Sequence, residues 1–191
     1  MPVQERALRT RQKLLDATVE ELLEHGYAAL STAGVARRAR VSRGAQQHHF
    51  PFKDELVIEA VRELVDRQLA AWREEAEDVD LATSLDITLD AFSGPLFAAV
   101  LELTLAARDN EGLTDATTEA EATLTAAIQR SGRRLLADLP PAEADLRWAM
   151  AIGTVRGFAM LRLFGRPSAS VKRQWAFARE KLVAMLVESP A

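Results

Sequence analysis

The chain has 191 residues, of which 48% are hydrophobic and 27% charged, a composition typical of a folded globular protein. It contains no cysteine, which excludes disulfides, thiolate metal ligands and cysteine nucleophiles. The formal net charge of −4 argues, by itself, against a polyanionic partner. The first residues are charged and lack the apolar segment of a signal peptide, and no apolar stretch reaches the length of a membrane span. We therefore expect a cytoplasmic protein with no membrane partner.

The charge is distributed unevenly along the chain. Residues 1–53 contain nine Lys or Arg and five Asp or Glu, a net charge of +4, whereas residues 54–191 carry −8. No Asp or Glu occurs in residues 25–53. A surface that faces DNA needs such a carboxylate-free window, because a carboxylate there would repel the phosphates. A solvated basic face is the alternative interpretation.

Hydrophobic residues recur at helical spacing through the whole chain, and no alternating strand pattern is found. The first predicted helix covers residues 5–25 and ends at Gly26, where a glycine can adopt the left-handed conformation. Further helices are predicted at 32–39, 43–49, 53–77, 80–92, 95–108, 113–137, 142–164 and 168–187. The sequence thus predicts an all-α fold with about nine helices.

The two short predicted helices lie inside the carboxylate-free window and are joined by residues 40–42, a spacing typical of a helix-turn-helix. Ser31 and Ser42 are suitable N-caps for them. Val35, Ala36 and Ala39 would form the apolar face of the first helix. The second helix presents Arg and Gln, which can bond guanine and adenine edges, and His, which can hold phosphates.

Residues 10–56 resemble the DNA-binding domain of the tetracycline-repressor (TetR) family of bacterial regulators. The matching residues are Arg11, Leu14–Ala17, Gly26–Tyr27, Ser31–Thr32, Val35–Ala39, Val41–Ala45, His49–Pro51 and Lys53–Leu56. The resemblance implies a three-helix DNA-binding domain in residues 1–53. It also implies a larger helical domain for ligand binding and dimerisation in residues 54–191.

The resemblance implies a role for each of nine DNA-binding residues: Arg11, Thr32, Ser42, Arg43, Gly44, Gln46, Gln47, His48 and Lys53. Arg43, Gln46 and Gln47 would meet base edges, and the alternative for each is plain solvent exposure. Thr32, Ser42, His48 and Lys53 would contact phosphates, although Thr32 and Ser42 could serve simply as N-caps. His49 would pack against the first helix and Phe50 would lie in the core.

Several positions depart from the family pattern. Arg40 stands where a turn glycine is usual, and a non-glycine residue with positive φ costs about 1–2 kcal/mol. Gln46 and Gln47 replace the usual buried Leu and the Tyr, so that Gln46 either stays partly exposed or needs hydrogen-bond partners. Phe52 replaces the small N-cap ahead of Lys53. These changes bear on affinity and operator sequence more than on the fold.

The remainder of the chain predicts a ligand cavity and a dimer interface. The aromatic and aliphatic candidates for contacting a small apolar or aromatic ligand are Trp72, Phe92, Phe97, Leu101, Leu124, Ile128 and Trp148, each of which could equally be a core residue. The candidates for the dimer interface are Gly153, Gly157, Leu161, Val171, Trp175 and Leu182. The alternative is that both of these helical stripes pack within one subunit. No cofactor or metal site is predicted.

The sequence favours a non-enzymatic transcriptional regulator, a ligand-responsive repressor that binds a palindromic double-stranded DNA operator as a homodimer. A helical enzyme or small-molecule carrier is disfavoured, because no phosphate-binding loop, nucleophile elbow or metal-ligand spacing occurs. A dimeric protein-binding module that has lost specific DNA recognition remains the alternative, motivated by Arg40, Gln46 and Gln47.

Overall fold

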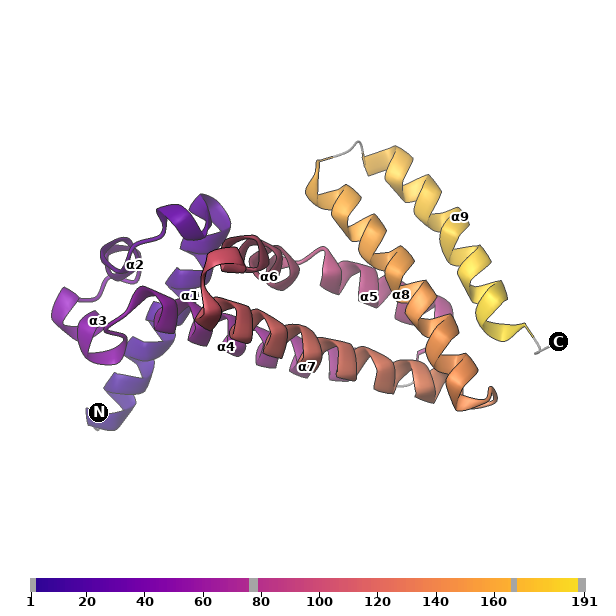
Figure 1. Ribbon diagram of the computed structural model, residues 1–191, viewed down its shortest axis with the longest axis horizontal. Coiled ribbons are helices and arrows are strands. Elements are labelled where there is room, and N and C mark those ends of the chain that lie inside the picture. Colours follow the sequence, from indigo (N-terminus) through magenta and orange to yellow (C-terminus); the bar gives the residue numbers. More distant parts are fainter. Residues whose placement is uncertain (1–2, 76–78, 166–167, 189–191) are drawn as a thin grey trace. The chain divides into compact units, whose positions relative to one another are not determined.

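The computed structural model describes residues 3–75, 79–165 and 168–188. Over these ranges the chain forms nine α-helices and one short 3-10 helix and has no strand (Figure 1). The elements are α1 (Val3–Ala29), α2 (Thr32–Arg38), α3 (Arg43–His49), α4 (Lys53–Glu75), α5 (Leu81–Phe92), α6 (Pro95–Ala106), η1 (Ala107–Asp109), α7 (Glu111–Leu135), α8 (Pro141–Leu163) and α9 (Ser168–Val187). The predicted all-α fold is confirmed.

The helix boundaries follow the capping residues closely. Ser31 accepts a hydrogen bond from the Gly34 amide at 3.1 Å, and Ser42 accepts one from the Ala45 amide at 3.2 Å, so both predicted N-caps are present. The helix α3 begins and ends at the predicted residues. The helix predicted at 95–108 ends earlier and continues as the 3-10 turn η1. The predicted helix end at residues 76–77 lies outside the described residues.

Gly26 interrupts the regular geometry of α1, although the helix does not end there as predicted but continues to Ala29. Its φ of 73° and ψ of 166° are accessible in practice only to glycine. A Cβ atom at this position would lie 2.7 Å from Oε1 of Glu102 on α6. The adjacent Tyr27 amide donates to the same carboxylate oxygen at 3.0 Å. The glycine therefore permits both the bend and the close approach of the Glu102 carboxylate.

The chain forms two compact units, one of Met1–Arg67 with Ala98–Glu121 and the other of Gln68–Phe97 with Ala122–Ala191. This division in space differs from a division of the chain after residue 53. The first half of α4 and the corner between α6 and α7 belong with the N-terminal helices. A boundary between DNA-binding and regulatory domains after residue 53 stays a prediction.

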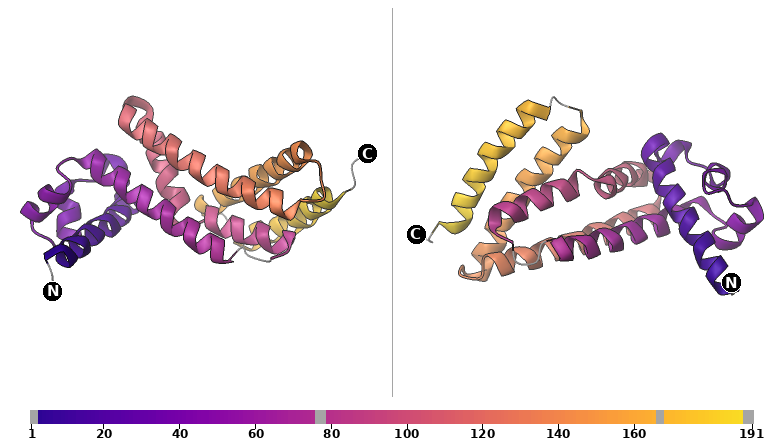
Figure 2. Two further views of the ribbon diagram at one scale, coloured as in Figure 1. Left: turned by 90° about the horizontal axis from the view of Figure 1, so that it is seen from below. Right: turned by 180° about the vertical axis from the view of Figure 1, so that it is seen from behind.

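In the first unit α1, α2 and α3 pack against one another (Figure 2). The core of these helices contains Leu14, Leu22, Val35 and Phe50, each at most 3% exposed. Apolar residues of α4 complete it, with Leu56 and Val57 fully buried. Burial of this apolar surface fixes the angle at which α3 is held.

In the second unit α8 and α9 lie side by side, and α5 packs against both (Figures 1 and 2). Trp148 of α8 is 2% exposed, and its indole N–H donates to the Ile128 carbonyl of α7 at 2.8 Å. A Cβ atom at Gly132 would come within 2.3 Å of the Trp148 ring. This glycine therefore allows the indole to lie directly on the α7 backbone.

No single described helix is long and apolar enough to cross a membrane. The bent pair α5 and α6 together pass a test of length and composition alone. Leu85 and Leu89 of α5 and Leu103 of α6 are fully buried within the protein, and buried core helices of this kind pass the same test.

Candidate nucleic-acid interface

The turn between α2 and α3 closes through two backbone hydrogen bonds. The Arg40 amide donates to the Arg37 carbonyl at 3.2 Å, and the Val41 amide donates to the Ala36 carbonyl at 3.0 Å. Arg40 has a φ of 56° and is the one non-glycine residue with positive φ in the described part of the chain. The arginine thus occupies the left-handed position that the family fills with glycine, at a cost of about 1–2 kcal/mol.

The outer face of α3 is polar and open to solvent. Arg43, Gly44, Gln47 and His48 are all exposed, and Ser42 caps the helix. An added Cβ at Gly44 would meet no atom within 4 Å, so the first turn leaves room for a close partner. Side chains that can bond base edges therefore stand together on one short helix with an unobstructed N-terminal turn.

Gln46 departs from the prediction that it meets base edges. Its side chain is 1% exposed, and its Nε2 atom donates to the Phe50 carbonyl at 2.6 Å. Its Oε1 atom is buried without a hydrogen-bond partner. The position lies on the inner face of α3, one residue before the exposed Gln47. The structure therefore fits the other expectation for Gln46, that of a residue at a usually buried position which needs a hydrogen-bond partner.

Two predicted DNA contacts, Arg11 and Lys53, make contacts with other residues of the protein. Arg11 pairs with Glu59 at 2.5 Å, and its guanidinium lies 5.6 Å from the centre of the Phe50 ring. The Lys53 ammonium donates to the Tyr27 carbonyl at 2.6 Å and lies 4.0 Å from the centre of the Tyr27 ring. Burial lowers the pKa of Lys53. Both side chains therefore hold α4 to α1.

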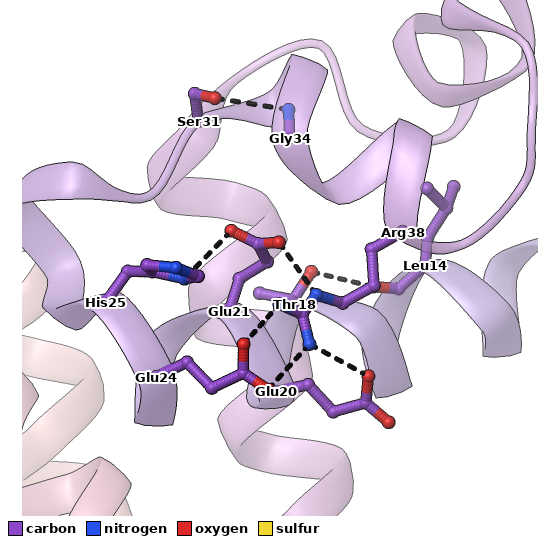
Figure 3. Close-up of polar contacts among 9 residues, drawn as sticks. All are labelled: Leu14, Thr18, Glu20, Glu21, Glu24, His25, Ser31, Gly34 and Arg38. Carbon is purple, nitrogen blue, oxygen red and sulfur yellow. Dashed lines mark hydrogen bonds and ion pairs between the residues drawn. The ribbon is translucent and has the colours of Figure 1, made fainter.

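Arg38 is enclosed by three carboxylates of α1 (Figure 3). Its Nε atom donates to Glu21 at 2.7 Å, its NH2 group donates to Glu24 at 2.5 Å, and its NH1 group lies 3.4 Å from Glu20. Hydrogen bonds to Glu24 and Glu21 raise the pKa of Arg38, and the bond from Arg38 lowers the pKa of Glu24. The positive charge of Arg38 therefore serves to fix α2 against α1.

The basic window contains two kinds of cation. Arg38 and Lys53 contact groups of the protein, whereas Arg37, Arg40 and Arg43 are exposed. Thr32 is half-buried at the first position of α2, where Ser31 provides the cap. His49 is half-buried, and burial is the main cause that lowers its pKa. The exposed arginines and the outer face of α3 together define the candidate nucleic-acid interface.

Six of the seven predicted ligand residues belong to the second compact unit and Leu101 belongs to the first. Trp72, Phe92, Ile128 and Trp148 are buried. Phe97 and Leu124 are half-buried. Ile128 and Trp148 line a cavity of about 180 Å³ between α7 and α8. Its other lining residues, which the sequence prediction did not include, are Thr125, Gln129, Ala149, Ile152, Gly153 and Arg156.

The predicted interface residues fall into two groups. Val171, Trp175 and Leu182 of α9 are at most 8% exposed within the single chain, so their stripe packs inside the subunit. Trp175 donates to Asp86 of α5 at 2.6 Å, which fixes this packing. The prediction of an intermolecular role for these three residues is therefore wrong for this fold, and the alternative of internal packing applies.

The small-residue row of α8 is different, because Gly153 and Gly157 are exposed and Leu161 is half-buried. An added Cβ at either glycine would meet no atom within 4 Å. Met150 and Leu146, which lie one and two turns before Gly153 on the same face, are 60% and 74% exposed. This face of α8 is apolar and uncovered in the single chain.

An exposed recognition helix, a tight turn and a basic window free of carboxylates define a helix-turn-helix DNA-binding protein. A family model described as "Bacterial regulatory proteins, tetR family" matches residues 14–60. An uncharacterized HTH-type transcriptional regulator of Mycobacterium tuberculosis (strain ATCC 25618 / H37Rv) is 30% identical over 137 residues, which are 69% of this chain and 70% of the relative. The chain belongs to the TetR family of bacterial regulatory proteins.

Two further comparisons agree with this assignment. A probable acrEF/envCD operon repressor of Escherichia coli (strain K12) is 34% identical over 71 residues, 34% of this chain and 32% of the relative. The crystal structure of a transcriptional regulator from Rhodococcus sp. Rha1 superposes with a TM-score of 0.72 and 26% identity, covering 94% of this chain and 99% of that one. The protein is a DNA-binding transcriptional regulator and not an enzyme.

Proposed function

We propose that the protein is a ligand-responsive repressor that binds a palindromic DNA operator as a homodimer. The observation that carries the proposal is the outer face of α3, where Arg43, Gln47 and His48 are exposed beside Ser42. This face lies within residues 25–53, which contain no Asp or Glu. Arg43 can bond guanine through O6 and N7, and Gln47 can bond adenine through N6 and N7. Ser42, Thr32 and His48 are the candidates for phosphate contacts.

The proposed dimer forms through the uncovered face of α8, with Leu146, Met150, Gly153 and Gly157 at its centre. Exposed apolar side chains in a row are costly in water, and glycine inside a helix costs about 1 kcal/mol relative to alanine. Close packing of a second copy would offset both costs. Two recognition helices related by a two-fold axis would read two half-sites about 34–36 Å apart.

The alternative of a protein-binding module without DNA recognition loses much of its support. Gln46 fills the buried position that an apolar residue occupies in the family, and Arg40 adopts the backbone conformation of the usual glycine. The departures that change the exposed surface are Gln47 and the side chain of Arg40, and both are polar groups that can contact DNA. Repression is proposed because one relative carries the name of an operon repressor.

The test is binding of the purified protein to duplex DNA from the region upstream of its own gene, followed by fluorescence anisotropy over a range of salt. The proposal predicts a salt-dependent complex centred on an inverted repeat, with a dimer in sedimentation. A monomer with no preference for any upstream repeat over scrambled DNA would contradict it.

A further inference from the structure

The turn between α2 and α3 keeps an arginine where the backbone conformation favours glycine. In the described part of the chain three residues have a positive φ, and the other two, Gly26 and Gly165, are glycines. Glycine adopts this conformation without strain, so Arg40, with its φ of 56°, makes the turn less stable than a glycine would. Strained residues of this kind are concentrated at functional sites. The side chain of Arg40 is therefore the part of the turn that needs an explanation.

This side chain has no partner within residues 3–75, 79–165 and 168–188, which the structure describes. It is exposed and takes part in no hydrogen bond, ion pair or ring contact there. Arg38, two residues earlier, is by contrast enclosed by three carboxylates of α1 (Figure 3). These carboxylates pair with Arg38 and leave the charge of Arg40 uncompensated. The charge of Arg40 thus does not stabilise the turn from within the protein.

Arg40 stands in the middle of a series of exposed arginines. Arg37 precedes it by three residues in the last turn of α2, and Arg43 follows it by three residues at the start of α3. The turn holds this arrangement, because the Arg40 amide donates to the Arg37 carbonyl at 3.2 Å. No Asp or Glu occurs in residues 25–53, so the window itself supplies no countercharge. Like charges repel one another, and a bound polyanion would relieve that repulsion.

We propose that Arg40 bonds a backbone phosphate of duplex DNA and fixes the turn of the helix-turn-helix to it. In this motif the first helix crosses the sugar–phosphate backbone and the second enters the major groove, so the turn that joins them passes the edge of the groove. Phosphates line that edge, and the planar guanidinium matches a phosphate in two-point geometry. The inference rests on the proposed recognition of DNA by α3 and adds a contact that carries no sequence information.

The phosphate contact predicts that stability and DNA affinity change in opposite directions when Arg40 is replaced by glycine. Arg40→Gly should unfold at a higher urea concentration than the wild type, because relief of the positive φ outweighs the extra freedom of glycine in the unfolded chain. The same variant should bind DNA more weakly. For each Arg40 that contacts DNA, the slope of log affinity against log salt should fall by about 0.9, which is about eightfold weaker binding at about 0.1 M salt.

The test measures binding of the full-length protein to scrambled duplex DNA and to the upstream repeat by fluorescence anisotropy, from about 0.05 to about 0.2 M salt. Urea unfolding is measured on the same proteins. Arg40→Asn, which tolerates the left-handed conformation without a charge, should lose as much affinity as Arg40→Gly on both DNAs. Arg40→Lys keeps the charge and should keep the salt slope.

The matched control is Arg130→Asn, which changes the net charge by the same amount. Arg130 is an exposed arginine of α7 in the second compact unit, and its replacement should leave DNA affinity unchanged. Unchanged affinity of Arg40→Gly for scrambled DNA at every salt concentration would overturn the proposal. A loss confined to the repeat would also overturn it, because Arg40 would then read a base. Weaker binding together with a lower urea midpoint would overturn it as well, since a damaged turn would explain the loss.

The scrambled duplex separates this inference from the function on which it rests. If the wild type has no preference for the repeat but Arg40→Gly still weakens binding to scrambled DNA, the operator proposal fails and the phosphate contact stands. If the wild type prefers the repeat and Arg40→Gly binds both DNAs as tightly as the wild type does, only the phosphate contact is wrong.

Discussion

Gln46 and Phe50 are joined by a hydrogen bond of 2.6 Å from the side-chain amide of the glutamine to the backbone carbonyl of Phe50. The bond lies inside the DNA-binding head, where the glutamine is 1% exposed. It replaces, with a polar contact, the purely apolar packing expected at this position of the recognition helix. The remaining oxygen of the amide has no partner, and an unsatisfied buried polar atom is costly.

Gln46→Leu should therefore stabilise the head by about 1 kcal/mol, because it removes the unpaired oxygen at the loss of one hydrogen bond. The DNA sequence preference should not change, since the side chain is buried. Urea unfolding and binding to a panel of operator variants check the two parts. Gln47→Leu is the control, because its exposed side chain should affect specificity and leave stability nearly unchanged. A changed preference in Gln46→Leu would contradict the placement of this residue.

Arg37 and Arg38 are neighbours on α2 with opposite expected roles. Arg37 is exposed, so Arg37→Gln should reduce the slope of log affinity against log salt by about 0.9 if it neutralises one phosphate. Arg38→Gln should leave that slope unchanged and lower the unfolding temperature, because three glutamates of α1 lose their shared partner. A reduced salt slope in Arg38→Gln with unchanged stability would refute the structural role of Arg38.

Asp54 links two elements of the first compact unit, since it accepts hydrogen bonds from the Tyr27 hydroxyl and, at 2.8 Å, from the Asn110 amide. The bond from Tyr27, followed by that from Asn110, lowers the pKa of Asp54 from its ordinary 3.8. A carboxyl group whose pKa is lowered by folding stabilises the folded state at pH values above its ordinary pKa. This stabilisation is lost as the pH falls through the lowered pKa. Burial, with the bond to Asp54, raises the pKa of Tyr27 to about 12.

The raised phenol pKa contributes stability that is complete below pH 10 and is lost as pH rises through about 12. Tyr27→Phe should therefore make the free energy of unfolding fall less at acid pH. It should also remove the fall at alkaline pH that comes from the bond between Tyr27 and Asp54. Urea unfolding of the two proteins from pH 2 to 5 and from pH 9 to 12 measures both differences. Parallel stability curves over the whole range would show that the pair contributes no pH dependence.

Gly157 tests the proposed dimer face. Within the single chain an added Cβ there meets no atom within 4 Å, so Gly157→Leu should fold and gain up to about 1 kcal/mol of helix stability. If a second copy packs closely on α8, the same change should shift sedimentation from dimer to monomer. Gly112→Leu is the matched control, an exposed helix glycine of α7 whose added Cβ comes no closer than 3.6 Å to Asn110. Dimerisation unaffected by Gly157→Leu would place the interface elsewhere.

The sequence predicts most of the helices because their ends are marked locally. Ser42 caps α3 and Phe50–Pro51 end it, so the boundaries need no tertiary information. The glycine at position 26 likewise predicts a helix end; its positive φ marks a break there, although α1 resumes and runs to Ala29.

What the sequence could not give depends on which helix faces which. The amphipathic stripe of α9 has the same pattern whether it packs on α5 and α8 or on another subunit, and here it packs internally. The contacts of Arg38 join residues 14 to 18 apart on two helices, and the cavity requires α7 beside α8. Periodicity fixes the face of one helix and carries no information on its neighbour.

The central claim is that the exposed face of α3 recognises DNA, and Arg43 tests it most directly. The measurement is the affinity of the wild type and of Arg43→Ala for the upstream inverted repeat and for scrambled DNA at one salt concentration. We predict that the variant loses about 1–3 kcal/mol of binding free energy, or about 5- to 150-fold in affinity, on the repeat and much less on scrambled DNA. Equal loss on both DNAs, or no loss on either, would contradict recognition by this helix.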